Sequence, residues 1–493
     1  MPGQREREVR VKTILRRISI FILSAVLACS ILPARASASY EIPGTCRVQA
    51  DDGAVYTVKT LDYSYGNNTY LSLRDVAMAL QGTEKSFSLE VKKSAISLNK
   101  GSAYAPVGVE NVPWEEDGNP DVSLRRNDFQ VDGQKVVYYT MIVKLPSGHY
   151  DCFMMAADLA MILDVNVTFP APGVMEVHTW EPLRISPAAL EEAGYFYGVN
   201  SVLVGDATTG EIYYRYQSDE PYPIASTSKL MTVLLTMDAI SAGQLTLEQP
   251  VTVSEAARAL SRSSDGVIPL ETGQQVPLQE LLKGALLPSS NECALCLAEA
   301  VAGSEEAFVQ MMNRKAAELG LSQAVFFNSH GLPSYTEGTV PSKRQNRMSA
   351  EDMFRLASYL LKVHPQVKDV SSQKEAVLES MDMRVRNTNP LLHNLPEVTG
   401  LKTGTTNKAG ACLVTSLTAD AGGVEHDLLV VVLGTEDSIE RGRVSGLLAR
   451  YALQAFDAGV EEPEPGTTGR TPEELPTHAE AAVERILQTA RKR

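Results

Sequence analysis

The stretch I-A-S-T-S-K-L-M-T-V, residues 224–233, decides how the rest of the chain is interpreted. Ser226 and Lys229 stand three positions apart, at the head of a run that is apolar almost throughout as far as Ile240. Such a run predicts a buried helix, in which a lysine of the first turn is costly unless it has a chemical task. Positions i and i+3 share one face of a helix, so we expect the serine hydroxyl to lie within reach of the lysine amine.

This serine and lysine have two interpretations. A desolvated lysine near another cation has a lowered pKa and can act as a base towards the serine, while the free N–H groups of a helix N-terminus can hold an oxyanion. The alternative is a serine that caps the helix and a lysine whose stem reaches solvent. S-x-x-K by itself favours the alternative, because the pattern arises by chance in many chains of this length.

A second motif, P-S-S-N at residues 288–291, follows a predicted helix at 278–287 and precedes another that begins at Asn291. It places the hydroxyl of Ser289 and the carboxamide of Asn291 on a tight turn between two helices. A simple helix N-cap is the alternative interpretation of this turn.

A third motif, G-L-K-T-G-T, occupies residues 400–405 and precedes a strand-like run. Lys402 and Thr403 suit the recognition of a carboxylate, and Gly404 would let a substrate backbone approach closely. The alternative interpretation is an ordinary strand edge with an exposed lysine.

The surrounding pattern predicts one α+β domain. A hairpin is expected from strands at 202–204 and 212–214, and two further strands from 413–417 and 428–433. The pattern between them is predominantly helical, and a helix is expected at 439–456. Strands at both ends of the segment imply a sheet built from both ends, with helices packed against it.

In this order within one domain, S-x-x-K, S-x-N and K-T-G resemble the penicillin-recognising serine acyl-transferases. The chain is most similar to the D-alanyl-D-alanine carboxypeptidases of the low-molecular-mass penicillin-binding proteins, peptidase family S11. The resemblance covers roughly residues 195–456. It rests on A-S-T-S-K-L-M-T (225–232), L-L-P-S-S-N-E (286–292), F-N-S-H-G-L (327–332), L-K-T-G-T-T (401–406) and V-V-L-G (431–434).

The resemblance implies a β-lactamase/transpeptidase-like fold, an antiparallel sheet with a helical cluster, and no metal or organic cofactor. Ser226 would attack the carbonyl between the two terminal D-alanines of a peptidoglycan stem peptide, and Lys229 would take its proton, kept neutral partly by Lys402. Ser289 would relay a proton to the leaving D-alanine, and Asn291 would orient the lysine and the substrate amide.

The resemblance also implies the binding residues. Lys402 and Thr403 would hold the terminal carboxylate beside Gly404, and the backbone N–H groups of Ser226 and Thr405 would form the oxyanion hole. An arginine after residue 433 is expected to assist, and Arg441 and Arg443 both compete for that place. Ser290 and Thr405 depart from many relatives, which have glycine at the first position and an aromatic residue or histidine at the second.

Partners and rival functions follow from the same resemblance. The substrate would be a stem peptide ending in D-Ala-D-Ala, with β-lactam antibiotics as inhibitors. A β-lactamase, a D,D-endopeptidase and a catalytically idle penicillin or muropeptide sensor remain open as alternatives. The formal charge of -15 argues against nucleic acid as a partner.

The regions outside the peptidase have their own patterns. Residues 1–38 read as a signal peptide, with an uncut membrane anchor or a lipoprotein site at Cys29 as alternatives. Residues 40–182 predict a smaller, non-catalytic α+β domain. Its signature L-R-D-V-A-M-A-L, residues 73–80, resembles the copper-amine-oxidase N-terminal-like domains, although no histidine cluster for copper is seen.

The peptidase domain is expected at 186–456, followed at 457–493 by a linker and a short amphipathic helix. That helix could lie on a membrane surface or on the protein itself. The protein is expected outside the cytoplasm, secreted or membrane-associated at the cell wall of a Gram-positive bacterium. Cys293 and Cys296 form a lone C-x-x-C, for which buried helical thiols are a better interpretation than a metal or redox site.

Overall fold

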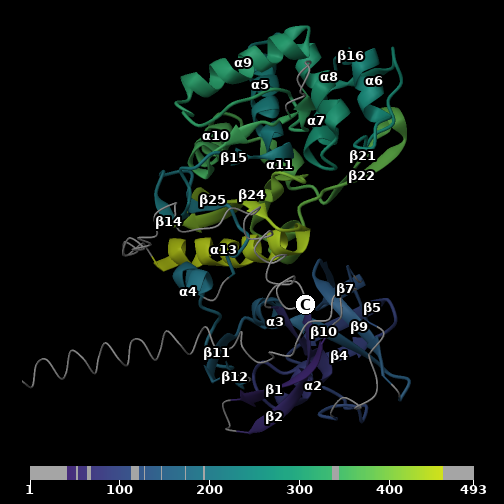
Figure 1. Ribbon diagram of the computed structural model, residues 1–493, viewed down its shortest axis with the longest axis vertical. Helices are drawn as coiled ribbons and strands as arrows, with labels where there is room; N and C mark the ends of the chain where they lie inside the picture. The colour runs from purple at the N-terminus through teal and green to yellow at the C-terminus, as the bar shows by residue number, and fades with distance from the viewer. Residues whose placement is uncertain are drawn as a thin grey trace, which may run out of the picture. The chain divides into compact units, whose positions relative to one another are not determined.

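The computed structural model describes residues 42–458, apart from 51–53, 64–67, 113–121, 127, 146, 172–173, 193–194 and 336–342. The predicted signal peptide and C-terminal amphipathic helix lie outside the described residues. The chain divides into unit 1, Met1–Tyr195 with Pro390–Pro396, and unit 2, Phe196–Asn389 with Glu397–Arg493 (Figure 1). Within the described part of the chain, no helix combines the length and the apolarity needed to cross a bilayer.

Unit 1 contains two sheets within its described residues. The larger has the strand order β11-β12-β1-β2-β3-β10-β9-β6 and the smaller the order β4-β5-β7-β8. The strands are β1 (Ile42–Ala50), β2 (Val55–Tyr63), β3 (Asn68–Ser72), β4 (Phe87–Val91), β5 (Ala95–Lys100), β6 (Val122–Arg126), β7 (Asp128–Val131), β8 (Gln134–Val136), β9 (Tyr139–Lys144), β10 (Tyr150–Met155), β11 (Asn166–Ala171) and β12 (Val174–His178). The helices are α2 (Leu73–Ala79), α3 (Ala156–Leu163), α4 (Pro187–Glu192) and α12 (Leu391–Asn394).

A strand followed directly by a short helix occurs twice in unit 1, as β3 with α2 and as β10 with α3. The two strands pair antiparallel, with Leu71 opposite Met154. The first helix begins where the Ser72 hydroxyl accepts a hydrogen bond from the Asp75 N–H at 3.1 Å, which satisfies a free donor of the first turn.

Unit 2 is built on a five-stranded antiparallel sheet with the order β14-β13-β25-β24-β23. Its strands are β13 (Ser201–Asp206), β14 (Ile212–Tyr216), β23 (Val398–Thr406), β24 (Gly410–Ala421) and β25 (Val424–Thr435). Strands from the two ends of the segment therefore lie side by side, and the predicted α+β class is confirmed.

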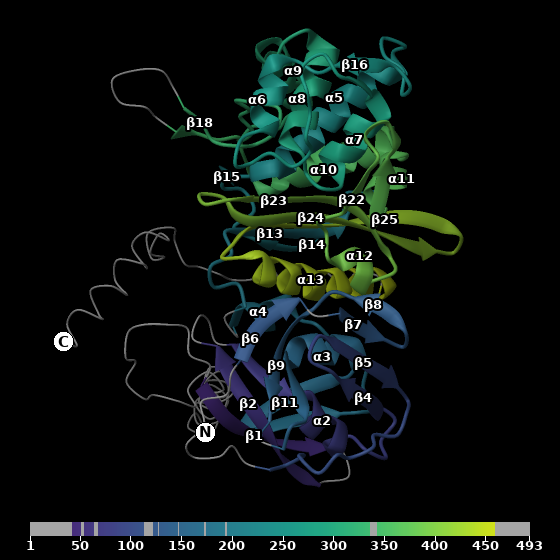
Figure 2. The same cartoon turned by 90° about the vertical axis from the view of Figure 1, so that its right-hand side faces the viewer.

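Helices cover both faces of this sheet. Helix α13 packs on β24 and β25, while α10 packs on β13 and β25 from the side that carries the helical cluster (Figure 2). The helices are α5 (Lys229–Ser241), α6 (Glu255–Ser261), α7 (Leu278–Leu286), α8 (Asn291–Ala302), α9 (Glu305–Glu318), α10 (Ala350–Val363), α11 (Val367–Ser371) and α13 (Ser438–Ala458). Short hairpins complete the unit: β15 (Tyr222–Pro223) with β20 (Arg347–Met348), β16 (Pro250–Thr252) with β17 (Gln275–Pro277), β18 (Ser334–Tyr335) with β19 (Lys343–Arg344), and β21 (Glu375–Leu378) with β22 (Met383–Arg386).

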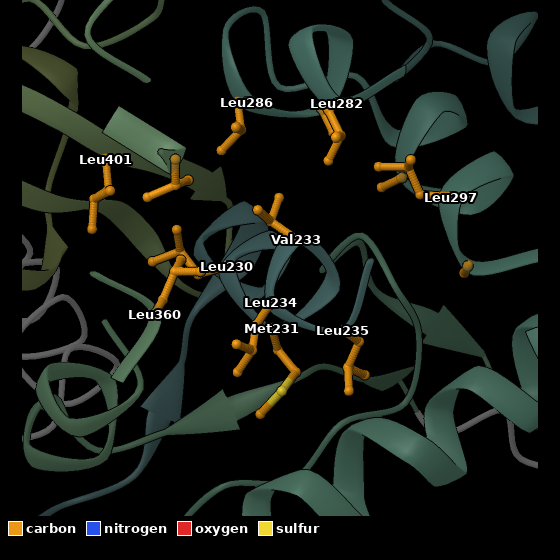
Figure 3. Close-up of a cluster of buried hydrophobic side chains, with 14 of the residues drawn as sticks. Leu230, Met231, Val233, Leu234, Leu235, Leu282, Leu286, Leu297, Leu360 and Leu401 are labelled. Carbon is orange, nitrogen blue, oxygen red and sulfur yellow. The ribbon is translucent and has the colours of Figure 1, made fainter. Parts of the chain in front are cut away.

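Helix α5 lies in the core of unit 2. Its apolar side chains are buried around most of its circumference, as the run beginning at residue 230 predicts (Figure 3). They meet leucines of α7, α8, α10 and β23, namely Leu282, Leu286, Leu297, Leu360 and Leu401. Each fully buried leucine, valine or methionine stabilises the fold by about 1.5–3 kcal/mol, so this packing fixes the position of the helix and of the lysine at its start.

Candidate active site

Ser226 lies in the 3-10 turn η1 (Ala225–Ser228), immediately before α5. The prediction that Ser226 and Lys229 belong to one α-helix is therefore wrong in detail, since the α-helix begins at Lys229. The backbone of Ala225 has φ 47°, in the left-handed region that alanine rarely adopts. Strained backbone of this kind persists where the surrounding structure holds it, often beside an active site.

Two glycines let other segments approach this turn. A Cβ at Gly331 would lie 2.0 Å from the carbonyl oxygen of Ala225, and a Cβ at Gly404 would lie 2.9 Å from the backbone nitrogen of Ser226. Both positions therefore exclude a side chain. Glycine at 404 is needed for the packing of the serine turn, while the close approach of a substrate backbone stays a prediction.

Lys229 is fully buried, and its amine meets three acceptors. Its Nζ lies 2.8 Å from Ser226 Oγ, 2.8 Å from Asn291 Oδ1 and 2.9 Å from the carbonyl oxygen of His330. Burial lowers the pKa of the lysine to about 7, although the negative charge of Glu292 acts in the opposite direction. The amine can therefore lose its proton near neutral pH.

Three residues in the turn between α7 and α8 have different environments. Ser290 is the N-cap of α8, where its hydroxyl accepts from the Cys293 N–H at 3.0 Å. Asn291 instead donates from Nδ2 to the carbonyl oxygen of Asp265 at 3.0 Å, which leaves its Oδ1 facing the lysine. Ser289 is half-buried and has φ 69°. The capping interpretation thus holds for Ser290, and the motif residue Asn291 contacts Lys229.

Strand β23 carries the K-T-G residues, and Lys402 is buried rather than exposed at a strand edge. Its Nζ donates to the carbonyl oxygen of Thr403 at 3.0 Å. Burial lowers the pKa of Lys402 well below its usual range, and the positive charges of Lys229 and Arg441 lower it further. An arriving carboxylate would favour the charged form of this lysine. For Lys229, burial rather than Lys402 is the main cause of the lowered pKa.

The structure distinguishes the two arginines that the sequence left unassigned. Arg441 Nη1 donates to Thr405 Oγ1 at 3.0 Å, which brings the guanidinium to β23. Arg443 Nη2 lies 2.6 Å from Glu440 Oε1, one turn earlier on the same helix. Arg441 is therefore the arginine beside the K-T-G segment.

The loop F-N-S-H-G-L, residues 327–332, contributes a backbone group that sequence reasoning missed. Its His330 carbonyl is one of the three acceptors of Lys229. The Asn346 carboxamide oxygen accepts from the Phe327 N–H at 2.7 Å, and the Asn328 side chain accepts from the Gly331 N–H at 2.6 Å. These hydrogen bonds fix the loop. The resemblance of this stretch to the family pattern indicates that the loop matters, but it does not indicate which atom of the loop contacts Lys229.

No group of three or more His, Cys, Asp or Glu side chains within the described ranges is arranged to hold a metal ion. Cys293 and Cys296 are buried free thiols on α8, as the sequence predicts. Burial raises the pKa of the Cys296 thiol to about 12, which keeps it protonated at neutral pH.

The L-R-D-V signature of unit 1 is occupied by internal contacts. The Lys59 amine lies 2.8 Å from both carboxylate oxygens of Asp75 and 3.1 Å from the Val109 carbonyl. Arg74 Nε donates to the Tyr150 carbonyl at 2.8 Å. Both signature side chains are buried, so they serve the packing of unit 1.

Comparison with known proteins agrees with this geometry. Residues 197–437 match the family Peptidase_S11, D-alanyl-D-alanine carboxypeptidase. The D-alanyl-D-alanine carboxypeptidase DacF of Bacillus subtilis (strain 168) is 33% identical over 259 residues, which cover 52% of this chain and 62% of that protein. DacC of Escherichia coli (strain K12) is 31% identical over 255 residues, 51% of this chain and 60% of that protein. The chain thus spans less than two thirds of the length of these relatives.

Solved structures are similar over the same region. The crystal structure of a peptidoglycan synthesis regulatory factor, PBP3, from Streptococcus pneumoniae has a TM-score of 0.48 and 32% identity, over 52% of this chain and 73% of that chain. Penicillin-Binding Protein D2 from Listeria monocytogenes, in its ampicillin-bound form, has a TM-score of 0.44 and 25% identity, over 52% of this chain and 97% of that chain.

The family match does not extend to unit 1, and the likeness of residues 40–182 to copper-amine-oxidase N-terminal-like domains stays a prediction. For the peptidase region, the order of the three motifs, the contacts of Lys229 and the sequence comparisons agree. Through residues 197–437, the chain belongs to peptidase family S11, the D-alanyl-D-alanine carboxypeptidases.

Proposed function

We propose that the protein is a serine-type D-alanyl-D-alanine carboxypeptidase, which removes the terminal D-alanine from peptidoglycan pentapeptide stems through an acyl-enzyme on Ser226. The observation that carries this proposal is the hydrogen bonding of Lys229. Its amine is buried and meets Ser226 Oγ, Asn291 Oδ1 and the His330 carbonyl at 2.8, 2.8 and 2.9 Å.

These three acceptors determine where the lone pair of a neutral Lys229 points. Asn291 Oδ1 and the His330 carbonyl oxygen can only accept hydrogen bonds, so they keep the two remaining N–H groups of the amine. The third position is the hydroxyl of Ser226, which can donate. The neutral lysine is therefore a base aimed at the serine proton, and its pKa of about 7 makes that form available at neutral pH.

The reaction then proceeds by acyl transfer. Ser226 Oγ adds to the carbonyl carbon between the terminal D-alanines while its proton passes to Lys229. Collapse of the tetrahedral intermediate breaks the amide bond, and a proton relayed through Ser289 reaches the nitrogen of the leaving D-alanine. Asn291 orients the lysine and the substrate amide. Water adds to the resulting ester and releases the shortened peptide.

The binding roles are assigned on the same basis. The backbone N–H groups of Ser226 and Thr405 are proposed to hold the oxyanion, which would stabilise the transition state more than the ground state. Lys402, Thr403 and Arg441 are proposed to hold the terminal carboxylate. Burial and the nearby charge of Arg441 destabilise the charged form of Lys402. A carboxylate that neutralises these two side chains therefore gains binding free energy.

Release of D-alanine from a synthetic pentapeptide tests the proposal. The wild type should release D-alanine with turnover, and Ser226→Ala should not. Cleavage of a cross-linked muropeptide dimer without D-alanine release would assign the endopeptidase reaction instead. A relative from Pseudomonas aeruginosa that is 31% identical is named D-alanyl-D-alanine endopeptidase. Rapid hydrolysis of a chromogenic β-lactam would indicate a β-lactamase. Stable acylation by β-lactams without any peptide turnover would favour a sensor.

The proposal extends to the location of the protein. Action on peptidoglycan places the enzyme outside the cytoplasm, and the acidic composition makes nucleic acid an unsuitable partner. Unit 1 is proposed to be a non-catalytic spacer or wall-binding domain of an enzyme from a Gram-positive bacterium. Residues 477–493, predicted from sequence as an amphipathic helix, are proposed to contact the membrane surface. An unchanged membrane fraction after their deletion would contradict that contact.

A further inference from the structure

Glu292, the residue after the S-x-N motif, is a fully buried carboxylate to which sequence reasoning assigned no role. Its Oε1 accepts from the backbone N–H of Val267, at 2.8 Å, and from that of Ile268. Its Oε2 has no hydrogen-bond partner among the residues that the structure describes. A buried carboxylate that is only half satisfied costs stability, so its presence calls for an explanation beyond packing.

The loop that Glu292 holds leads back to the catalytic lysine. The carbonyl oxygen of Asp265, within this loop, accepts from Asn291 Nδ2 at 3.0 Å. That hydrogen bond decides which end of the carboxamide faces Lys229, because the amide group can present only one of its two ends there. A continuous path of contacts thus runs from Glu292 through the loop backbone to Asn291 and the lysine amine.

Local hydrogen bonds also shape the loop. Ser261 Oγ donates to the Ile268 carbonyl at 2.6 Å and accepts from the Leu270 N–H at 2.9 Å, so it closes the base of the loop. Asp265 itself is exposed. Within the loop, Ser263 accepts from the Asp265 N–H at its Oγ, at 3.2 Å, and from the Gly266 N–H at its carbonyl oxygen, at 3.1 Å. Glu292 in turn ties the backbone two residues after Asp265 to the start of α8.

Glu292 also acts on Lys229 through its charge. The carboxylate raises the pKa of the lysine, against the larger lowering effect of burial, and the Cys293 thiol has a smaller effect in the same direction. Two other groups face the amine. Lys402 on β23 has a pKa well below its usual range, and the pKa of His330 is lowered to about 3, so the imidazole stays neutral.

We propose that Glu292 is a positioning residue for the acylation of Ser226, which fixes the loop 261–268 and, through Asp265, the orientation of Asn291 towards Lys229. This inference rests on the proposed function, in which neutral Lys229 is the base. It assigns to Glu292 two separable contributions: hydrogen bonds that hold the loop, and a negative charge that favours the protonated lysine.

Two variants separate these contributions. Glu292→Gln keeps an oxygen acceptor for the loop and removes the charge, while Glu292→Ala removes both. The rate constant for acylation of the full chain by benzylpenicillin would be measured from pH 5 to pH 9 by intact mass. Without the carboxylate the lysine loses its proton more easily, so the midpoint for Glu292→Gln should move down by about half a unit or more. Glu292→Ala should lower the rate at every pH by roughly tenfold or more, because Asn291 loses its fixed orientation.

Glu280→Gln is the matched control. Glu280 is also buried, on α7, and its carboxylate likewise accepts from a backbone N–H, that of Ser380, at 3.1 Å, and from the Ser380 hydroxyl at 2.6 Å. This variant should keep the wild-type midpoint. Thermal unfolding of all variants identifies any that do not fold, and if Glu292→Ala is one of them, the midpoint of Glu292→Gln decides.

The outcomes are distinct. A wild-type midpoint for Glu292→Gln would overturn the proposal, and so would a variant that is acylated normally but deacylated slowly, since the carboxylate would then act on water. Failure of the wild type itself to be acylated would instead refute the proposed function.

Discussion

The pH dependence of acylation follows directly from the burial of Lys229. Only the neutral amine can accept the proton of Ser226, and burial lowers the pKa of the lysine to about 7. Acylation should therefore increase with pH. With a pKa of about 7, the neutral fraction grows from roughly 1% at pH 5 to about 99% at pH 9, so the rate should rise roughly 100-fold and level off above pH 8. His330, next to the amine, stays neutral throughout because its pKa is about 3.

The measurement is the second-order rate constant for acylation by benzylpenicillin, followed by intact mass in samples quenched over time at constant ionic strength. Ser226→Ala gives the background from hydrolysis and non-specific labelling. A lysine with its ordinary pKa near 10.5 would still gain about tenfold per pH unit at pH 9. A rate that continues to rise in this way, or that does not depend on pH, would refute the argument that a desolvated Lys229 is the base.

Three other predictions concern single side chains. Arg441→Gln should raise KM for a pentapeptide by about 10- to 100-fold, as expected for the roughly 1.5–3 kcal/mol of a hydrogen bond to a charged group, while Arg443→Gln should leave it near wild type in the same steady-state assay. The reverse result would show that Arg443, and not Arg441, binds the substrate. Ser290→Ala should lower the free energy of unfolding in urea by about 1 kcal/mol and keep acylation, and a variant that loses acylation at unchanged stability would contradict the capping role. Lys59→Met leaves Asp75 buried without its counterion and should lower the free energy of unfolding by about 3–5 kcal/mol, as measured by calorimetry, with β-lactam acylation retained in the folded protein. Lost acylation there would give unit 1 a catalytic role.

Much of the site could be predicted because side-chain chemistry repeats in a recognisable order. Ser226, Lys229 and Asn291 meet as the motifs predict. The apolar run after Lys229 places the lysine inside the core, where it loses its water. Strand patterns at both ends of the segment predict the sheet that contains β13, β14, β24 and β25. The structure adds β23 to this sheet and packs its Gly404 on the serine turn.

What the sequence could not show depends on backbone groups and on helix phase. The third acceptor of Lys229 is the carbonyl of His330, and a carbonyl group is the same for every residue type. The left-handed conformation of Ala225 leaves no trace in its identity.

Arg441 and Arg443 stand two positions apart, which on a helix turns them about 200° from each other, so only the phase of α13 decides which one meets β23. The burial of Lys402 could not be predicted from the sequence either. β23 is the edge strand of its sheet, and packing against η1 and α11 covers it, so this lysine loses its water.

The most direct test of the account is the mass of the intact protein after incubation with benzylpenicillin, combined with peptide mapping of the adduct. The account predicts addition of one benzylpenicillin in the wild type, located on Ser226, and no addition in Ser226→Ala. An adduct that persists in Ser226→Ala, or a folded wild-type protein that forms none, would contradict the central claim that Ser226 is the nucleophile activated by Lys229.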